Sequence, residues 1–362
     1  MNGKKVVVAM SGGVDSSTAA ALLKDQGFEV IGMSMQLWDY SERGARDTAG
    51  SCCSLDDVYD ARRVADTLDI PFYVVNMEEV FSREVVDYFV GSYLKGFTPN
   101  PCIKCNDVMK FDVLLRKSME IGAGYLATGH YARIRREAGA CRLLKADDAA
   151  KDQSYFLFTM TQDRLKRVLF PLGSLTKDEV RGCAKKFGLG VAEKRESQEI
   201  CFVEDGHYSD LISTRAGARH ASRPGDIVDR LGAPLGSHNG LFRYTIGQRR
   251  GLDIKDGQGP YYVVGMDLPA NRLIVGKEDE LLSRGLLANG VTWITDGPED
   301  GEGVDVKIRY RHEPARAVIS RRGNDVRVMF STPQKSVTPG QAAVFYRGEE
   351  VLGGGWIERA IG

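Results

Sequence analysis

Two adjacent glycines followed by a hydroxyl-rich segment limit the folds open to this chain. The segment Ser11–Ser17 reads Ser-Gly-Gly-Val-Asp-Ser-Ser and directly follows Lys4–Ala9, a β-branched run typical of a buried strand in a parallel sheet. Strong helix formers continue to Gly27, and Ser16–Thr18 are suitable N-cap residues for that helix. A strand, a glycine-rich turn and a helix N-terminus present backbone N–H groups and a positive dipole end to an anion. We therefore expect a phosphate site here.

This loop differs from the common nucleotide-binding loop, because no Lys followed by Ser or Thr comes after its second glycine. It resembles instead the loop of the ATP pyrophosphatases, which grip the terminal phosphates of ATP as a unit and leave the α-phosphate open to attack. Enzymes of that kind adenylate an oxygen and release pyrophosphate. The resemblance implies an ATP site, and a glycine-rich turn without a ligand is the alternative.

Strands and helices alternate along the first third of the chain. Short apolar runs at 29–37, 71–77 and 125–132 predict further strands, and segments at 54–68, 80–96 and 106–122 predict helices. This alternation is typical of a doubly wound parallel sheet of the α/β class. Since ligands bind beyond the carboxyl ends of such strands, Met35 and Gly129 should flank an adenine ring. Core packing is the alternative for Met35.

The sequence pattern changes after residue 205 and again near residue 284, which predicts three domains. We expect a catalytic α/β domain at 1–205, a central adapter at 206–283 made of short segments broken by Gly and Pro, and a C-terminal domain at 284–362. Part of 160–195 is expected to pack with the adapter. Six strands predict a small closed β-barrel in the last domain, at 290–295, 304–310, 315–320, 325–330, 342–347 and 350–357.

Composition indicates a cytoplasmic protein with a polyanionic partner. We expect no contact with a membrane, since no apolar run approaches the roughly 18 residues of a membrane helix and no signal peptide is recognised. The net charge is zero, yet basic residues outnumber acidic ones in 130–195 and 306–347. The run Lys307–Arg311 alternates basic and apolar side chains, which would place its cations on one face of a strand. RNA is the expected partner, and solvated helix and strand faces are the alternative.

Two of the seven cysteines lie in segments suited to reactive thiols. Cys105 follows a proline-rich loop and precedes a helix expected to start at Asn106, so the helix dipole and Lys104 should favour its thiolate. A structural zinc pair with Cys102 is the alternative, although no second Cys-x-x-Cys supplies the other two ligands. Cys201 lies between charged residues and an apolar segment, and a compact fold would join it to Cys105 as a pair that carries and resolves sulfur.

Taken together, the motifs resemble those of the tRNA-specific 2-thiouridylases over nearly the whole chain. Seven segments match in order: Ser11–Ser17, Thr98–Asn106, Thr128–Tyr131, Lys151–Gln153, Ile200–Phe202, Tyr244–Gly251 and Thr338–Gln341. Members of that family have a catalytic ATP-pyrophosphatase domain, an adapter and a C-terminal β-barrel, and they replace O2 of the wobble uridine of certain tRNAs with sulfur. The resemblance implies a tRNA-uridine 2-sulfurtransferase that uses ATP and Mg²⁺, binds the anticodon region of tRNA and receives sulfur from a donor protein or carrier.

The resemblance also implies roles for individual residues. ATP would be bound by Ala9, Met10, Ser11, Gly12, Gly13, Val14, Asp15, Ser16, Met35 and Gly129. Cys105 would be the catalytic nucleophile and Cys201 the persulfide carrier, with a transient disulfide between them. The target base would contact Asn100, Pro101 and Cys102, and tRNA would contact His130, Lys151, Asp152, Gln153, Arg309, Tyr310 and Gln341.

One position departs from the family pattern. Many members have Asp where this chain has Cys102, and an acid/base role has been given to that Asp. Either another group or water moves the proton here, or Cys102, Cys105 and Cys201 together hold a [4Fe-4S] cluster. The nearest rival function is that of another adenylating ligase of the same loop family, acting on a carbonyl or a nucleobase without either cysteine. A nucleotide-regulated RNA-binding module is a second rival.

Overall fold

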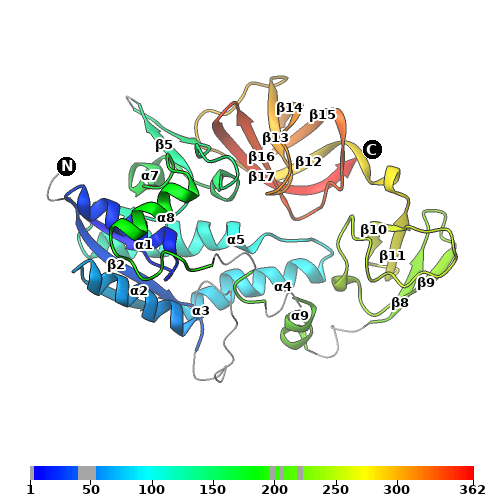
Figure 1. Cartoon of the computed structure of the whole chain (residues 1–362). Coiled ribbons are helices and arrows are strands. Elements are labelled where there is room, and N and C mark those ends of the chain that lie inside the picture. Colours follow the sequence, from blue (N-terminus) through cyan, green and yellow to red (C-terminus); the bar gives the residue numbers. More distant parts are fainter. Residues whose placement is uncertain (1–3, 40–53, 138, 196–199, 204–207, 218–222) are drawn as a thin grey trace.

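The chain forms three bodies, seen in Figure 1 as a helix-covered parallel sheet, a small sheet module and a barrel. The computed structural model describes residues 4–39, 54–137, 139–195, 200–203, 208–217 and 223–362. Within these residues, no helix has both the length and the apolar character needed to span a membrane.

A five-stranded parallel sheet organises the first body. Its strands lie in the order β3-β2-β1-β4-β7, and their bounds are β1 (Lys5–Ala9), β2 (Glu29–Gln36), β3 (Phe72–Asn76), β4 (Tyr125–Ala127) and β7 (Val168–Leu169). The side chains of Val6–Val8 are fully buried, because Val7 packs into the hydrophobic cluster on one face of the sheet and Val6 and Val8 into the cluster on the other. The chain moves from β1 outward to β3 and returns with β4 on the other side of β1, so the switch point lies between β1 and β4. The doubly wound α/β fold is confirmed.

Helices cover this sheet and extend from it towards the other bodies (Figure 1). Their bounds are α1 (Val14–Asp25), α2 (Leu55–Thr67), α3 (Glu78–Phe81), η1 (Ser82–Val86), α4 (Asp87–Leu94), α5 (Pro101–Lys104), η2 (Cys105–Leu114), α6 (Leu115–Glu120), η3 (Ser154–Leu157), α7 (Gln162–Lys166), α8 (Lys177–Lys186) and α9 (Tyr208–Ala216). The elements α3, η1 and α4 follow one another without a break, as do α5, η2 and α6. Within 160–195, which we expected to pack partly with the adapter, α8 packs against α1.

Two expected boundaries in this body are wrong. The helix expected from Asn106 begins five residues earlier, because the Asn100 side chain accepts hydrogen bonds from the N–H groups of Cys102 and Ile103 and Pro101 occupies the first helical position. The fourth strand ends at Ala127 rather than near residue 132, since the chain then turns onto the N-terminus of α1.

The adapter is a four-stranded mixed sheet with a small core. Its order is β10-β11-β8-β9, with bounds β8 (Gly225–Val228), β9 (Pro234–His238), β10 (Tyr262–Asp267) and β11 (Arg272–Gly276), and the short helices are η5 (Leu241–Arg243) and η6 (Glu278–Leu281). Ile227, Val263 and Leu273 are fully buried in its core. The core is small, so we expect the adapter to depend on its neighbours for part of its stability.

The C-terminal body is a closed barrel of six antiparallel strands, as the sequence pattern predicted. The strands are β12 (Leu282–Trp293), β13 (Gly303–Lys307), β14 (Ala315–Arg322), β15 (Asp325–Lys335), β16 (Ala342–Arg347) and β17 (Glu350–Ile361). Their order is β12-β15-β14-β13-β16-β17, and pairing of β12 with β17 closes the barrel. One expectation is wrong: β13 ends at Lys307, so Arg309 and Tyr310 lie in a turn and the run Lys307–Arg311 does not present its cations along a strand.

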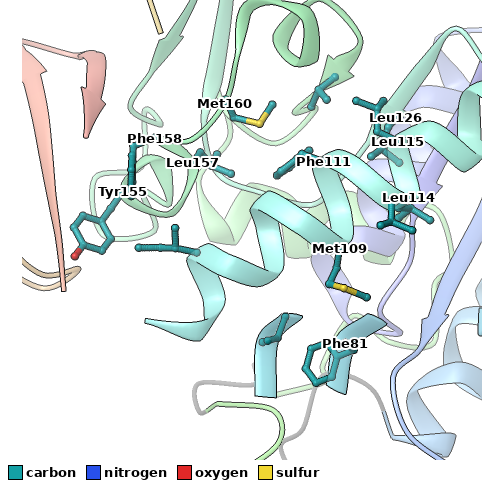
Figure 2. Close-up of a cluster of buried hydrophobic side chains, with 14 of the residues drawn as sticks. Phe81, Met109, Phe111, Leu114, Leu115, Leu126, Tyr155, Leu157, Phe158 and Met160 are labelled. Atoms are coloured by element: carbon teal, nitrogen blue, oxygen red, sulfur yellow. The ribbon is translucent and has the colours of Figure 1, made fainter. Parts of the chain in front are cut away.

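The first body and the barrel share one sheet. The hairpin of β5 (Arg133–Arg136) and β6 (Cys141–Leu144) belongs to the first body, and β6 pairs with β17 through Leu143 and Leu144. The Arg142 guanidinium binds the Glu350 carboxylate at 2.7 Å across this junction. A hydrophobic cluster then continues from the parallel sheet to the barrel; its members near α3, η2 and η3 are drawn in Figure 2, where Met109 points towards Phe81. The two bodies therefore pack as a unit.

Candidate active site

The phosphate loop turns directly from β1 into α1. The Ser11 N–H donates to Ser16 Oγ at 3.1 Å, and the Ser17 hydroxyl donates to the Gly13 carbonyl at 2.8 Å. The hydroxyl residues were expected to cap α1, but the N-cap residue is Gly13, and no side chain forms a capping hydrogen bond there. Because no side-chain cap occupies the start of α1, its first-turn N–H groups can bind an anion.

Two glycines make close approaches that fix this loop. Gly12 has φ +69°, and a Cβ placed on it would lie 2.1 Å from the Asp57 carbonyl oxygen. A Cβ on Gly129 would lie 2.7 Å from the Ser16 backbone nitrogen. The loop after β4 therefore packs against the first turn of α1 at the switch point, and only glycine permits this distance. The sequence singled out Gly129, and the structure brings it to the phosphate loop.

The Asp15 carboxylate of the loop binds two groups from distant parts of the chain. The Tyr131 hydroxyl donates to Asp15 Oδ1 at 2.8 Å, and Lys177 Nζ donates to the same oxygen at 2.7 Å. Lys177 is buried, with 9% of its surface exposed. The loop has no lysine of its own, so Lys177 supplies a cation there from the N-terminus of α8. Sequence reasoning missed this residue, because the capping box of Thr176 and Glu179 around it indicated only a structural role.

A second lysine, Lys194, forms a hydrogen bond with the backbone of the phosphate loop. Lys194 Nζ donates to the Gly12 carbonyl at 3.1 Å and to Asp57 Oδ1 at 2.6 Å, and it also binds Asp60. Burial disfavours its charged form, but the hydrogen bonds that it donates to Asp57 and Asp60 outweigh this effect and raise the pKa of Lys194. The positive charge is therefore held beside the loop at neutral pH. No motif spacing pointed to Lys194.

Met35 lies near the end of β2, half-buried and paired in register with Val75 of β3. The residues Ala9–Ser16 and Gly129 lie around the carboxyl ends of β1 and β4. The structure thus places Ala9–Ser16, Met35 and Gly129 at one edge of the sheet, the edge at which ligands bind in folds of this type.

The two expected catalytic cysteines pack against the same hydrophobic cluster. Cys105 is half-buried one turn after the Asn100 cap, whereas Cys102 is exposed. Cys201 is also half-buried, and its neighbour Phe202 is 3% exposed. The Phe202 ring lies among other aromatic rings, with centroid distances of 5.1 Å to Phe89, 5.8 Å to Phe81 and 6.3 Å to Trp38. Since α3 and η1 pack against η2 and α5, this aromatic anchor holds the Cys201 segment near the helix that carries Cys105.

The three cysteines considered as cluster ligands do not form a metal site in the structure. Across the described ranges, from residue 4 to 362 with their gaps, no three His, Cys, Asp or Glu side chains are grouped closely enough to hold a metal ion. Cys102, Cys105 and Cys201 therefore do not form a closely grouped set of ligands for a single metal ion in this structure.

Several residues expected to contact tRNA have structural contacts of their own. His130 is 9% exposed and packs between Phe111 and Phe170, and its Nδ1 lies 2.7 Å from Thr128 Oγ1. Burial, and to a lesser degree the Lys110 ammonium, hold the pKa of this imidazole well below its usual range, so His130 is neutral near pH 7. Its contact with tRNA stays a prediction.

The segment Lys151–Gln153 also forms hydrogen bonds inside the first body. Asp152 is 7% exposed and accepts hydrogen bonds from the N–H groups of Ala146 and Ser154. Gln153 Oε1 accepts from the Tyr131 N–H at 3.0 Å, which helps to hold the tyrosine that binds Asp15. Lys151 is half-buried. Contact of these residues with RNA is untested by this geometry.

The barrel residues expected to contact tRNA lie beside the first body. The Arg309 side chain is exposed and donates to the Lys335 carbonyl at 3.1 Å. The Tyr310 ring lies 4.6 Å from the Phe156 ring, centroid to centroid. Gln341 Nε2 donates to the Thr98 carbonyl at 2.9 Å, in the loop that precedes α5.

Comparison with protein families agrees with this arrangement of sheet, adapter and barrel. Residues 4–205 match the family described as tRNA methyl transferase HUP domain, 217–277 match its PRC-barrel domain, and 283–357 match the aminomethyltransferase β-barrel domain. The fold and the loop at the switch point thus define an ATP-using HUP-domain enzyme with two accessory domains.

Relatives that align over nearly the whole chain show which family within this class the chain belongs to. A tRNA-specific 2-thiouridylase MnmA of Geobacter metallireducens is 56% identical over 362 residues, which cover 99% of this chain and 98% of that protein. The protein of the same name from Geotalea uraniireducens is 54% identical, covering 99% of this chain and 96% of that protein. The chain belongs to the tRNA-specific 2-thiouridylase family, and it is a tRNA sulfurtransferase.

Among solved structures, a U34-tRNA thiolase from Methanococcus maripaludis with its [4Fe-4S] cluster covers 61% of this chain at 20% identity, with a TM-score of 0.35 and 68% of that protein aligned. A score this low supports no argument about a cluster in this chain.

Proposed function

We propose that this enzyme adenylates O2 of the wobble uridine of tRNA and then replaces that oxygen with sulfur carried by Cys201. The observation that carries the adenylation step is the contact of Gly129 with the first turn of α1. This contact brings the loops after β1 and β4 together to form one candidate phosphate site. The aromatic anchor of Phe202 supports the second half, since it brings the Cys201 segment to the helices that pack against α5.

In the adenylation step, the loop at Ser11–Ser16 binds the β- and γ-phosphates through backbone N–H groups. Lys177 neutralises the Asp15 carboxylate, which would otherwise repel the phosphates. Mg²⁺ enters as part of the ATP substrate. Uracil O2 attacks the α-phosphorus, the bond from that phosphorus to the bridging oxygen breaks, and pyrophosphate leaves. The product is an O2-adenylated base, in which AMP is a good leaving group.

In the sulfur step, a donor protein or carrier first loads Cys201 as a persulfide. The terminal sulfur attacks C2 of the base, and the C2–O2 bond breaks to release AMP. Cys105 then attacks the Cys201 sulfur, which forms a Cys105–Cys201 disulfide and leaves the sulfur on the base as 2-thiouridine. Alternatively, Cys105 attacks the persulfide first and releases hydrosulfide, which attacks C2. An external dithiol returns the disulfide to two thiols.

The target base reaches this site by leaving the anticodon stack, as in other enzymes that modify bases. Asn100, Pro101 and Cys102 lie at the start of α5 and are the proposed contacts of the base. The proton that the missing Asp would move is assigned to water or to another group. Because tRNA is the proposed substrate, we place the enzyme in the cytoplasm.

The test is the nucleoside content of tRNA incubated with the enzyme, MgATP and a sulfur source. Mass spectrometry should show 2-thiouridine only with the complete mixture, and pyrophosphate release should depend on tRNA. Replacing Cys201→Ser should abolish thiolation and leave ATP binding unchanged. Retained thiolation in that variant would disprove the role of Cys201, and a Cys105→Ser enzyme with full activity would favour an adenylating ligase instead. A visible-light spectrum of protein purified without oxygen tests for a cluster.

A further inference from the structure

The loop that precedes α5 is held by the barrel rather than by its own domain. The Thr98 N–H donates to the Pro339 carbonyl at 2.9 Å, and Gln341 Nε2 donates to the Thr98 carbonyl at 2.9 Å. Both backbone hydrogen-bonding groups of Thr98 are therefore bound by one short turn of the barrel, which lies 241 to 243 positions later in the sequence (339 − 98 and 341 − 98).

The adapter contacts the same residue. The Thr98 hydroxyl lies 3.4 Å from the Thr245 hydroxyl, a distance at the long end for a hydrogen bond between hydroxyl groups. Thr98 is thus the point at which three bodies meet. The barrel supplies the stronger contacts, because its two bonds are short and engage backbone groups.

The barrel turn that holds Thr98 is itself hydrogen-bonded to β17. The Gly340 N–H donates to the Ile357 carbonyl and the Ile357 N–H donates to the Gln341 carbonyl, each at 2.8 Å, which ties the turn to β17. Gly340 has φ +90°, and a Cβ on it would lie 2.9 Å from both Phe97 Cβ and the Thr98 nitrogen. The turn and the loop therefore approach as closely as glycine allows.

The backbone position at Thr98 affects the proposed reactive residues, because they follow it closely in the sequence. Asn100 comes two residues later and caps α5, and Cys105 follows in the next turn. A second contact steadies the helix, since Asn106 Nδ2 donates to the Phe156 carbonyl at 3.3 Å. The neighbouring Tyr155 hydroxyl donates to the Ala342 carbonyl of the barrel at 3.0 Å. The helix start is thus connected to the barrel on both sides.

We propose that the barrel turn Thr338–Gln341 is a positioning element for the loop that precedes α5, and that Gln341 is a positioning residue. Gln341 fixes the backbone at Thr98, and through it the Asn100 cap and the place of Cys105. This role is separate from the contact with tRNA that the family resemblance implies for Gln341. The inference rests on the proposed function in one respect, which is that Asn100 meets the base and Cys105 takes part in sulfur transfer.

The two roles of Gln341 predict different kinetics. A residue that only contacts tRNA supports binding, so its loss raises KM for tRNA. A residue that positions the loop supports the geometry of the reacting groups, and displacement of such groups by about 1 Å can lower a rate up to about 100-fold without weakening binding. The positioning role also acts in the enzyme without tRNA, where a contact with RNA has no effect.

The main test uses Gln341→Met, which keeps the length of the side chain and removes the amide donor. We expect kcat for thiolation to fall about tenfold while KM for tRNA changes less than about twofold. In the tRNA-free enzyme, the rate at which iodoacetamide alkylates Cys105, followed by peptide mass spectrometry, should change at least about threefold. A raised KM with unchanged kcat and unchanged alkylation would overturn the proposal and leave Gln341 as an RNA contact.

A pair of glycine variants provides a second test that does not alter Gln341. Gly340→Ala introduces a methyl group against Phe97 and Thr98 and should lower kcat in the same way. Gly323→Ala is the matched control, because Gly323 also has a positive φ (+63°) in the barrel but has nothing within 4 Å of an added methyl group. Equal losses of kcat in both variants would show a general effect of barrel stability and overturn the proposal.

Failure of the inference and failure of the proposed function give different results. If the wild-type enzyme forms no 2-thiouridine, the proposed function fails before any variant is compared. If the wild-type enzyme thiolates tRNA and Gln341→Met does so with the same kcat and the same Cys105 alkylation rate, only the positioning role fails.

Discussion

The molecule holds its two reactive loops in different ways. The phosphate loop is braced by its own domain: Gly129 packs against Ser16, Lys177 binds Asp15 and Lys194 binds the Gly12 carbonyl. The loop before α5 is braced at Thr98 by the barrel and the adapter. Under the proposed function, activation of ATP would depend on one domain, whereas the geometry of sulfur transfer would depend on all three. Variants of the phosphate loop and of the residues that contact it should impair both steps, and variants that displace the loop before α5 should impair thiolation alone.

The largest effect is expected for Gly129→Ala. The added methyl group would lie 2.7 Å from the Ser16 nitrogen and would separate the loops after β1 and β4. We expect tRNA-dependent pyrophosphate release to fall about 100-fold, as for other displacements of reacting groups. Gly124→Ala is the control at the opposite end of β4, where the nearest atom to a new methyl group is the Lys5 carbonyl at 3.7 Å. Equal activity of the two variants would contradict a phosphate site at this contact.

A smaller loss is expected for Lys177→Met, which removes the buried cation beside Asp15. Without this cation the Asp15 carboxylate would lie uncompensated beside the proposed phosphate site. A charge-assisted hydrogen bond contributes about 1.5–3 kcal/mol, so the apparent affinity for ATP should fall about 10- to 100-fold. Isothermal titration with a non-hydrolysable ATP analogue measures the change. Lys185→Met on the same helix is the control, because Lys185 forms an exposed ion pair with Glu193. Equal affinity of the two variants for the analogue would contradict an ATP site beside Asp15.

The proposed sulfur chemistry can be tested separately from the phosphate loop through Phe202→Ala, which acts on the Cys201 segment. Loss of this ring, which is packed on Phe81 and Phe89, should displace Cys201 and lower kcat for thiolation about tenfold. The affinity for the ATP analogue should stay within about twofold of wild type, because the ring packs in a different hydrophobic cluster from Met10 and Val14 of the phosphate loop. Phe202→Leu refills part of the space and should recover part of the rate. A weakened ATP affinity in Phe202→Ala would show that the two regions are not independent.

The smallest effect concerns the pH dependence of stability in the first domain. The folded state lowers the pKa of His130 through burial, whereas the unfolded chain binds a proton near pH 6.5. This contribution to stability is fully present above about pH 6.5 and is lost as the pH falls below that value. Between pH 7.5 and 5.5, the wild type should lose about 1 kcal/mol more than His130→Asn in urea unfolding. His238 and His312, whose pKa values are also lowered by burial, titrate in both proteins. Equal losses of stability in the wild type and in His130→Asn would mean that His130 is not the group responsible for the pH dependence.

Local sequence signals predicted most of the fold. The β-branched run of β1, the capping box at Thr176 and the regular spacing of the barrel strands are patterns within about ten residues, and each led to the observed element. The start of α5 was missed although Asn100 and Pro101 carry a strong helix-start signal, because the later Asn106 was chosen as the cap. The end of β13 at Lys307 was missed because alternation continues into the turn.

Contacts between distant segments could not be predicted. Lys177 reaches Asp15 across 162 positions, and no spacing rule connects a helix N-cap region to a phosphate loop. The bond between Gln341 and Thr98 spans 243 positions and depends on how the barrel docks on the first body. The burial of His130 likewise arises from Phe111 and Phe170, which lie on either side of it in the sequence. Such pairs follow from tertiary packing, which single-sequence patterns do not encode.

The strand β17 both closes the barrel against β12 and joins the barrel to β6 of the first body. It follows every other described element in the chain, so a ribosome makes it after them. The parallel sheet and its phosphate loop can fold while synthesis continues, but the turn at Gln341 is tied to Ile357 and waits for β17. A nascent chain would thus form the proposed phosphate site before the barrel can fix the loop that carries the proposed sulfur chemistry, which would delay thiolation until β17 has left the exit tunnel.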